Sequence, residues 1–423
     1  MLKRFIFLLL AFVFSFGLVA CGGTGIESAP TDPADYIIQT RRDAAESYMR
    51  QMASYTWRAG QDVTYTRDTK VLTEDDLANY TGNETLKIVK GRLYRGIPYS
   101  YTGASAWNFY DYTSEPDEQG IATLDGVHWR MLNGGSTIGA TLGNDCSSSI
   151  ELAWDYVGSN IQLANTTYMT KMYGYLPVGK YKSSETQNVM TPDTCKSNGI
   201  AVMSEAYTGL QKADAVVKRD ATWGHTMMIV ENHVVRGTDG AVDPENSYVT
   251  VLHQTSSYMK KEAKVFDPAL GEDVYIIYGI DDKYTYQSLF DQGYLPVTCD
   301  VFVDPAPVED VYVRDTEKEY SFDNILKGQF VSNRILSAVT ITITDDSGNV
   351  VMKGTCYERR QTCLPILSFD LQRFETQMPE VQRGKIDLDA LAPGNYHCTH
   401  VVRDAHGVCY TMRDFDFTVP GQS

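Results

Sequence analysis

The first regular pattern of apolar residues lies between Asp35 and Trp57. Apolar side chains recur there at intervals of three and four residues, at Ala45, Tyr48, Met49, Met52 and Tyr55. This spacing places them along one side of an α-helix, with arginine and glutamate residues on the other sides. We therefore expect a helix that packs on the domain after it, within a helical N-terminal segment over residues 35–90.

The middle of the chain mixes helical and strand patterns. Two β-type runs, Thr226–Val230 and Tyr248–Leu252, lie on either side of the turn-forming cluster Gly237–Gly240. Short apolar runs separated by such a turn are typical of adjacent antiparallel strands. We expect a hairpin here, and the run from Val274 to Ile280 predicts a further strand. The fold class is therefore expected to be α+β.

After Pro305 the periodicity is that of strands alone. Val339–Ile343 and Val350–Met352 lie on either side of the turn-forming segment Asp345–Asn349. The last strand pattern, which ends with Phe415–Val419, is similar to the final hairpin of an immunoglobulin-like sandwich. We expect residues 301–423 to form an all-β immunoglobulin-like domain. This similarity concerns the fold alone.

The first residues resemble a bacterial lipoprotein signal. Met1–Arg4 include a lysine and an arginine, residues 5–19 are almost wholly apolar, and Cys21 follows Leu-Val-Ala. The apolar run is short for a membrane span. The resemblance implies a signal peptide at 1–20, lipidation of Cys21, a flexible tether at 21–34 and an extracytoplasmic protein anchored to a bacterial membrane. An ordinary secretory signal with an incidental cysteine is the alternative.

The composition excludes some classes of protein. The chain has 423 residues, with 37 basic and 54 acidic side chains, so its formal charge is −17. Such a chain repels a phosphate backbone and has no basic patch, which excludes general nucleic-acid binding. Its hydrophobic fraction of 43% is enough to build packed cores. The length predicts more than one domain.

Cysteine spacing does not indicate a zinc site, because none of the eight cysteines belongs to a CxxC pair. For an exported protein we expect one or two disulfides between C-terminal strands, among Cys356, Cys363, Cys398 and Cys409. His397, Cys398 and His400 resemble a metal cluster along the sequence, but alternation in a strand places His397 on the opposite face. A strand with a disulfide is expected instead.

Cys146 lies where a buried helix is predicted to begin. One apolar helical stripe follows it, and Gly158 is a plausible C-terminal stop; the stripe consists of Ile150, Ala153, Trp154 and Val157. Unpaired N–H groups and the helix dipole favour the thiolate form of a cysteine at a helix start. A buried structural cysteine gives the same local pattern, so Cys146 alone does not identify a nucleophile.

Two histidines lie on the predicted hairpin. His225 begins the first strand after Gly224, and His253 ends the second. Because side chains alternate along a strand, Val249, Val251 and His253 share one face, and pairing of the two strands can bring the imidazoles together. A second ring would then orient the first. Gln254 competes for this role but points to the opposite face of a regular strand.

The order of these motifs is similar to that of the NlpC family of papain-like cell-wall cysteine peptidases. The shared pattern is Asp145-Cys146-Ser147 at a helix start, then Gly-His225 opening a strand, then His253 ending the next. Gly96-Ile97-Pro98-Tyr99 also looks like the family's Gly-x-Pro-Tyr segment before the nucleophile. The resemblance covers about residues 92–280 and implies a papain-like domain at 91–300. Ser148 stands where the family usually has Gly, and two insertions, 100–145 and 236–247, lengthen the pattern.

The resemblance implies a role for each matching residue. Cys146 would be the nucleophile, His225 the base and later the acid, and His253 the residue that orients His225. On the substrate side, Asp145 would receive the free amine of a short peptide stem, beside Tyr99 and Ser147. This chemistry requires no cofactor and no metal, and its partner would be peptidoglycan stem peptides.

Three hypotheses about the function are compatible with these residues. The leading hypothesis is a lipid-anchored cysteine hydrolase, a peptidase or amidase that cleaves amide bonds of cell-wall peptides. Its C-terminal module would position the enzyme or bind a cell-surface partner. The first alternative is a surface binding or adhesion lipoprotein without hydrolysis, and the second is an acyl or amide transferase that uses the same triad.

Overall fold

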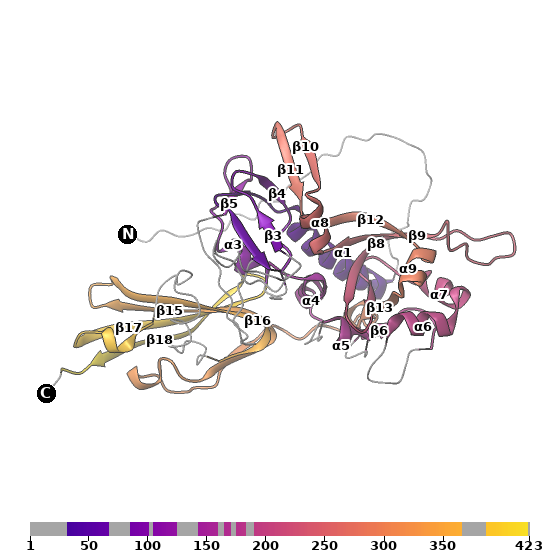
Figure 1. The fold of residues 1–423 in the computed structure, drawn as a ribbon. Helices are drawn as coiled ribbons and strands as arrows, with labels where there is room; N and C mark the ends of the chain where they lie inside the picture. Colours follow the sequence, from indigo (N-terminus) through magenta and orange to yellow (C-terminus); the bar gives the residue numbers. More distant parts are fainter. Residues whose placement is uncertain are drawn as a thin grey trace.

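The structure, a computed structural model, has the α+β fold class expected from the sequence (Figure 1). It describes residues 32–66, 85–100, 105–124, 143–159, 165–170, 175–182, 190–365 and 386–421. The predicted signal peptide, the lipidation site Cys21 and most of the tether lie outside these residues. Within the described ranges, every helix is too short or too polar to cross a membrane.

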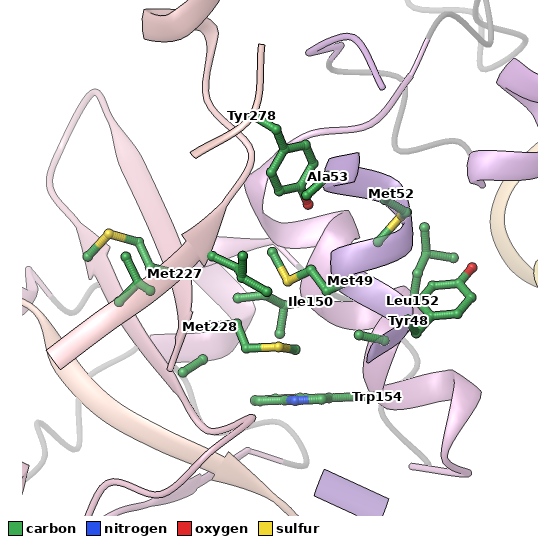
Figure 2. Close-up of a cluster of buried hydrophobic side chains, with 14 of the residues drawn as sticks. Tyr48, Met49, Met52, Ala53, Ile150, Leu152, Trp154, Met227, Met228 and Tyr278 are labelled. Atoms are coloured by element: carbon green, nitrogen blue, oxygen red, sulfur yellow. The ribbon is translucent and has the colours of Figure 1, made fainter. Parts of the chain in front are cut away.

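Helix α1 spans Pro33–Ser54 and confirms the predicted N-terminal helix. Asp32 caps it by accepting a hydrogen bond from the backbone N–H of Ala34. Its predicted stripe is buried at Ala45, Tyr48, Met49 and Met52. Figure 2 shows Tyr48, Met49 and Met52 in one cluster with Ile150 and Trp154 of helix α4 (Cys146–Tyr156) and Met228 of strand β8 (Gly224–His233). The helix is thus part of the main core.

The segment after α1 departs from the prediction of a helical region over residues 35–90. It contains strands β1 (Thr56–Ala59), β2 (Val63–Thr66) and β3 (Thr85–Ile88). β1 joins a five-stranded sheet in the order β10-β11-β4-β1-β5. Its other strands are β4 (Leu93–Arg95), β5 (Ala122–Leu124), β10 (Lys264–Asp267) and β11 (Glu272–Ile276). Residues on both sides of position 90 therefore share one sheet.

A six-stranded sheet, in the order β12-β9-β8-β7-β13-β6, carries both histidines. The predicted hairpin is confirmed, because β8 pairs antiparallel with β9 (Tyr248–His253). The other strands are β6 (Tyr175–Pro177), β7 (Ala215–Arg219), β12 (Gly279–Thr285) and β13 (Leu295–Cys299). The helices after α4 are α5 (Thr166–Thr170), α6 (Thr191–Asn198), α7 (Ile200–Tyr207), α8 (Ser256–Lys261) and α9 (Tyr286–Gln292).

The single strand predicted from Val274 to Ile280 is two strands in different sheets. β11 pairs with β4 in the first sheet, whereas β12 pairs with β9 in the second. Ile277 and Tyr278, which connect them, are both buried. The sequence pattern hid this crossing because the connecting residues Ile277 and Tyr278 are apolar and buried, so the apolar run is not interrupted between the two strands.

The C-terminal region confirms the predicted strand hairpins. Its strands are β14 (Val313–Asp315), β15 (Gln329–Asp345), β16 (Val350–Pro365), β17 (Gly394–Asp404) and β18 (Cys409–Val419). They form a five-stranded antiparallel sheet in which long β15 pairs with β14, β16 and β17. Among the described residues these strands form one sheet rather than two facing sheets.

The disulfides predicted for this region do not involve Cys398 or Cys409, which carry free thiols. Cys409 pairs in register with Arg403, five residues along β17 from Cys398. At about 3.4 Å per residue this separates the two cysteines by roughly 17 Å, far beyond the span of a disulfide. The thiol of Cys398 is buried 3.7 Å from Nδ1 of His400.

The C-terminal sheet contacts the rest of the protein through its β17–β18 turn and the strand before it. Arg403 places Nη1 2.8 Å from both carboxylate oxygens of Asp111, next to helix α3 (Ala106–Tyr110). His406, in the turn, lies with Nε2 2.6 Å from Oδ2 of Asp155 on α4. The sheet is therefore attached to the helix that begins at Cys146.

The fully buried side chain of Met49 provides a test of this core. Replacement of Met49 by Ala should lower the free energy of unfolding by about 2–5 kcal/mol, because it removes packing atoms and leaves a cavity. Gln51→Ala, at an exposed position of the same helix, should change it by less than about 0.5 kcal/mol. Urea unfolding of both variants measures the difference; equal effects would contradict the packing of α1.

Candidate active site

The N-terminus of α4 holds Cys146 in a fixed position. Asp145 is the N-cap, and its Oδ1 accepts a hydrogen bond of 2.7 Å from the backbone N–H of Ser148. In return the backbone N–H of Asp145 donates to Oγ of Ser148 over 2.8 Å. This reciprocal capping box satisfies two groups that a helix start leaves unpaired. Ser148, which departs from the family pattern, thus closes the cap.

Cys146 is the first residue of the helix and is 7% exposed. It lies where the positive end of the helix dipole stabilises a thiolate. Tyr278 lies nearby on the connection between β11 and β12. Burial raises the pKa of Tyr278, and the charge of a Cys146 thiolate raises it further, so the Tyr278 hydroxyl stays protonated.

The Gly-Ile-Pro-Tyr segment lies directly beside the residues that precede Cys146. The backbone N–H of Ser100 donates to the carbonyl of Asn144 over 2.9 Å, and Tyr99 pairs with Asn144 as an isolated parallel bridge. Gly143 has a φ of +148°, and a Cβ there would lie 1.9 Å from the carbonyl oxygen of Pro98. Only glycine allows the backbone at position 143 to lie this close to Pro98. The structure thus brings together the motifs at 96–99 and 143–146.

The two histidines meet as the strand pattern predicted. Nε2 of His225, on β8, lies 2.8 Å from Nδ1 of His253, on β9. Both side chains are buried, with exposures of 7% and 4%. The helix α4 packs against β8, so the buried thiol and the imidazole pair belong to adjoining elements. The pairing of the two imidazoles confirms the prediction from the strand pattern, whereas a contact between Cys146 and His225 stays a prediction.

Asp282 and Tyr258 extend the pair, and sequence reasoning did not single them out. Nε2 of His253 lies 2.8 Å from Oδ2 of Asp282 on β12, and the Tyr258 hydroxyl donates to the same carboxylate. The consecutive Asp281 and Asp282 were a visible signal in the sequence. Their relation to His253 depends on the path of β12, which the apolar pattern did not reveal.

Burial sets the charge of the first imidazole. It lowers the pKa of His225 well below 6.5, and the charge of Lys218 lowers it further. His225 is therefore neutral at neutral pH and able to accept a proton. Trp223 stacks on its ring with the centroids 5.7 Å apart. The site thus holds an unprotonated base beside a partly exposed aromatic ring.

The residues expected on the substrate side lie at the helix start. Oγ of Ser147 donates to Oδ1 of Asp145 over 3.0 Å, and both side chains are buried. Tyr99 is also buried, with 6% exposure. Asp145 and Ser147 thus support the cap in this structure, while contacts of all three residues with a peptide stay a prediction. His128 and Trp129 of the insertion at 100–145 lie outside the described residues.

Comparisons with known proteins add little to this geometry. No family model and no curated protein matches the chain. Among solved structures it is similar to a tetra-tandem repeat in the extending region of a large adhesion protein, at 14% identity and a TM-score of 0.17. The match covers 49% of this chain and 41% of the adhesion-protein chain. At this TM-score the likeness carries no information about the function of the site.

The low pKa of His225 predicts a pH dependence of stability. An unfolded histidine titrates near 6.5, so below that pH the unfolded state binds a proton at position 225. Folded His225 does not yet bind this proton, because its pKa is lower. This contribution therefore destabilises the folded state as pH falls below about 6.5, by up to about 1.4 kcal/mol per pH unit. Unfolding free energies between about pH 7.5 and 5 should fall more steeply for the unmodified protein than for His225→Gln. Parallel curves would contradict the burial of a neutral imidazole.

Proposed function

We propose that this protein is an NlpC-like cysteine hydrolase that cleaves amide bonds of peptidoglycan stem peptides. The observation that supports it best is the buried hydrogen bond of 2.8 Å between His225 and His253, on the sheet against which the helix of Cys146 packs. A nucleophile, a base and an orienting group in this order are what amide cleavage by a thiol requires. Residues 91–300 would form the papain-like domain.

In the proposed reaction, neutral His225 takes the proton of the Cys146 thiol. The thiolate attacks the carbonyl carbon, and the negative oxygen of the tetrahedral intermediate accepts hydrogen bonds from backbone N–H groups at the start of α4. The C–N bond breaks as the His225 imidazolium protonates the leaving amine. Water, deprotonated by His225, then hydrolyses the thioester and restores the thiol.

The substrate class rests on the resemblance and on the expected location. Asp145 would attract the free amine of a short peptide stem, and its carboxylate lies one residue from the thiol. The lipid on Cys21 would keep the enzyme at the outer face of a bacterial membrane, near the cell wall. The C-terminal region, proposed to be immunoglobulin-like, would position the catalytic domain through its contact with α4.

Replacement of Cys146 by Ala tests the proposal. Cleavage of purified peptidoglycan, followed by mass spectrometry of the released stem peptides, should fall by at least about ten-thousand-fold, because the covalent step is lost. Cys409→Ala is the matched control, since Cys409 is an exposed thiol of the C-terminal sheet, and it should cleave at the normal rate.

Iodoacetamide labelling of the unmodified chain gives a second, substrate-free readout. Cys146 should react faster than Cys409, whose pKa is raised by burial, and far faster than Cys195, whose pKa burial raises to about 12. Undiminished cleavage by Cys146→Ala would exclude the hydrolase. Slow labelling of Cys146 together with absent cleavage would favour a binding protein on the same scaffold.

A further inference from the structure

The hydrogen bonds of the imidazole pair continue to a carboxylate. His253 uses both ring nitrogens: Nδ1 lies 2.8 Å from His225, and Nε2 lies 2.8 Å from Oδ2 of Asp282. The Tyr258 hydroxyl lies 2.6 Å and 2.7 Å from the two carboxylate oxygens of Asp282. A continuous path of hydrogen bonds therefore runs from Tyr258 through Asp282 and His253 to His225.

The chemistry of these groups fixes where each hydrogen lies. An ionised carboxylate only accepts hydrogen bonds, so Nε2 of His253 must carry the hydrogen shared with Asp282. When His253 carries only this one hydrogen, its Nδ1 holds the lone pair and accepts from Nε2–H of His225. The remaining nitrogen of His225, Nδ1, is therefore unprotonated. Asp282 thus sets the tautomer of both rings, and it leaves His225 with one basic nitrogen.

The backbone of β12 is shaped to deliver Asp282 to this position. Ile280 pairs with Leu252 and Asp282 with Val251, so Asp281 is an extra residue in the strand. Asp281 has a φ of +55°, and its side chain turns away to an exposed ion pair with Arg50. Of two consecutive aspartates, the bulge directs only Asp282 to His253.

Gly279 gives the His253 ring the space that this geometry needs. It pairs with His253 across the sheet, and a Cβ at Gly279 would lie 2.2 Å from Cδ2 and 2.3 Å from Nε2 of the imidazole. Any other residue would push the ring from its place between His225 and Asp282. The bulge and the glycine both belong to β12 and serve the same contact.

We propose that Asp282 is the positioning residue of this site: it fixes the tautomers of His253 and His225 so that Nδ1 of His225 accepts the proton of Cys146. The role as a base rests on the function proposed above. Once His225 is protonated, the same carboxylate stabilises the positive charge through His253. Asp282 acts through the two rings and does not contact the substrate.

The charges around the path are consistent with an ionised Asp282. Burial raises the pKa of its carboxyl, but the hydrogen bonds from His253 and Tyr258, together with the charge of Lys261, outweigh burial, and the net pKa is lowered. Tyr284 packs edge-on against His253, and Lys218 faces His225 from β7. Asp282 is thus an anion at neutral pH. The two lysines near this path of hydrogen bonds are Lys218 and Lys261.

Nitrogen NMR of histidine-labelled protein tests the tautomers directly. At about pH 7.5, His225 and His253 should both show a protonated Nε2 and a bare Nδ1. The signals are assigned with His225→Gln and His253→Gln. A hydrogen on Nδ1 of either ring would overturn the proposal, and this readout requires no substrate.

Asp282→Asn tests the charge while keeping the shape of the side chain. We expect kcat for stem-peptide cleavage to fall about tenfold to a hundredfold with little change in KM, and the midpoint of Cys146 alkylation to rise by about one pH unit. Asp281→Asn is the matched control: it removes the neighbouring charge at a position where asparagine tolerates a positive φ. Equal kcat values and equal alkylation midpoints for the two variants would overturn the role of Asp282.

Tyr258→Phe is a milder variant, and it tests the proposal even if Asp282→Asn does not fold. Loss of its hydrogen bond should raise the pKa of Asp282, so the acid limb of activity should move to higher pH while the rate near pH 7.5 changes less than about threefold. An unmoved acid limb would count against the proposal. Slow alkylation of Cys146 in the unmodified chain would contradict the proposed hydrolase instead. The two measurements therefore distinguish a failure of the hydrolase proposal from a failure of the role of Asp282.

Discussion

The burial of α4 is the constraint on which the rest of the site depends. The helix packs against α1 on one side and β8 on another, and its residues from Cys146 to Asp155 are buried. A helix held in this way cannot move without opening the core, where each large side chain contributes about 2–5 kcal/mol. The capping box at Asp145 and Ser148 adds local rigidity. Cys146 is therefore fixed by the packing of the whole domain.

The same packing explains why the strands can hold an imidazole network. β8 and β9 are neighbours within a sheet, so side chains on one face stay about 5–8 Å apart. His225 and His253 occupy such a diagonal pair, and β12 adds Asp282 from the third strand. Each group comes from a different strand, yet each strand is hydrogen-bonded to the next. Buried polar groups are stable here because each has a partner, and the cost of burying them alone is avoided.

Local periodicity was sufficient to predict part of the site. The helix start at Cys146, the hairpin of β8 and β9 and the meeting of the two histidines all follow from repeats of 3.6 and 2 residues. Asp282 was not predictable, because a bulge at Asp281 changes the register and a buried crossing at Ile277 and Tyr278 changes the sheet. Such features depend on tertiary packing. The disulfides predicted for Cys398 and Cys409 are wrong for a similar reason, since the number of cysteines says nothing about the distance between these two thiols.

The contact between His406 and Asp155 has a mechanical consequence. Asp155 lies nine residues after Cys146, about 13 Å away along the helix axis. The C-terminal sheet therefore contacts α4 near its C-terminal end, whereas Cys146 lies at its N-terminal end. Load on the sheet would therefore bear on the helix that carries Cys146, and the packing of that helix against α1 and β8 would resist its displacement.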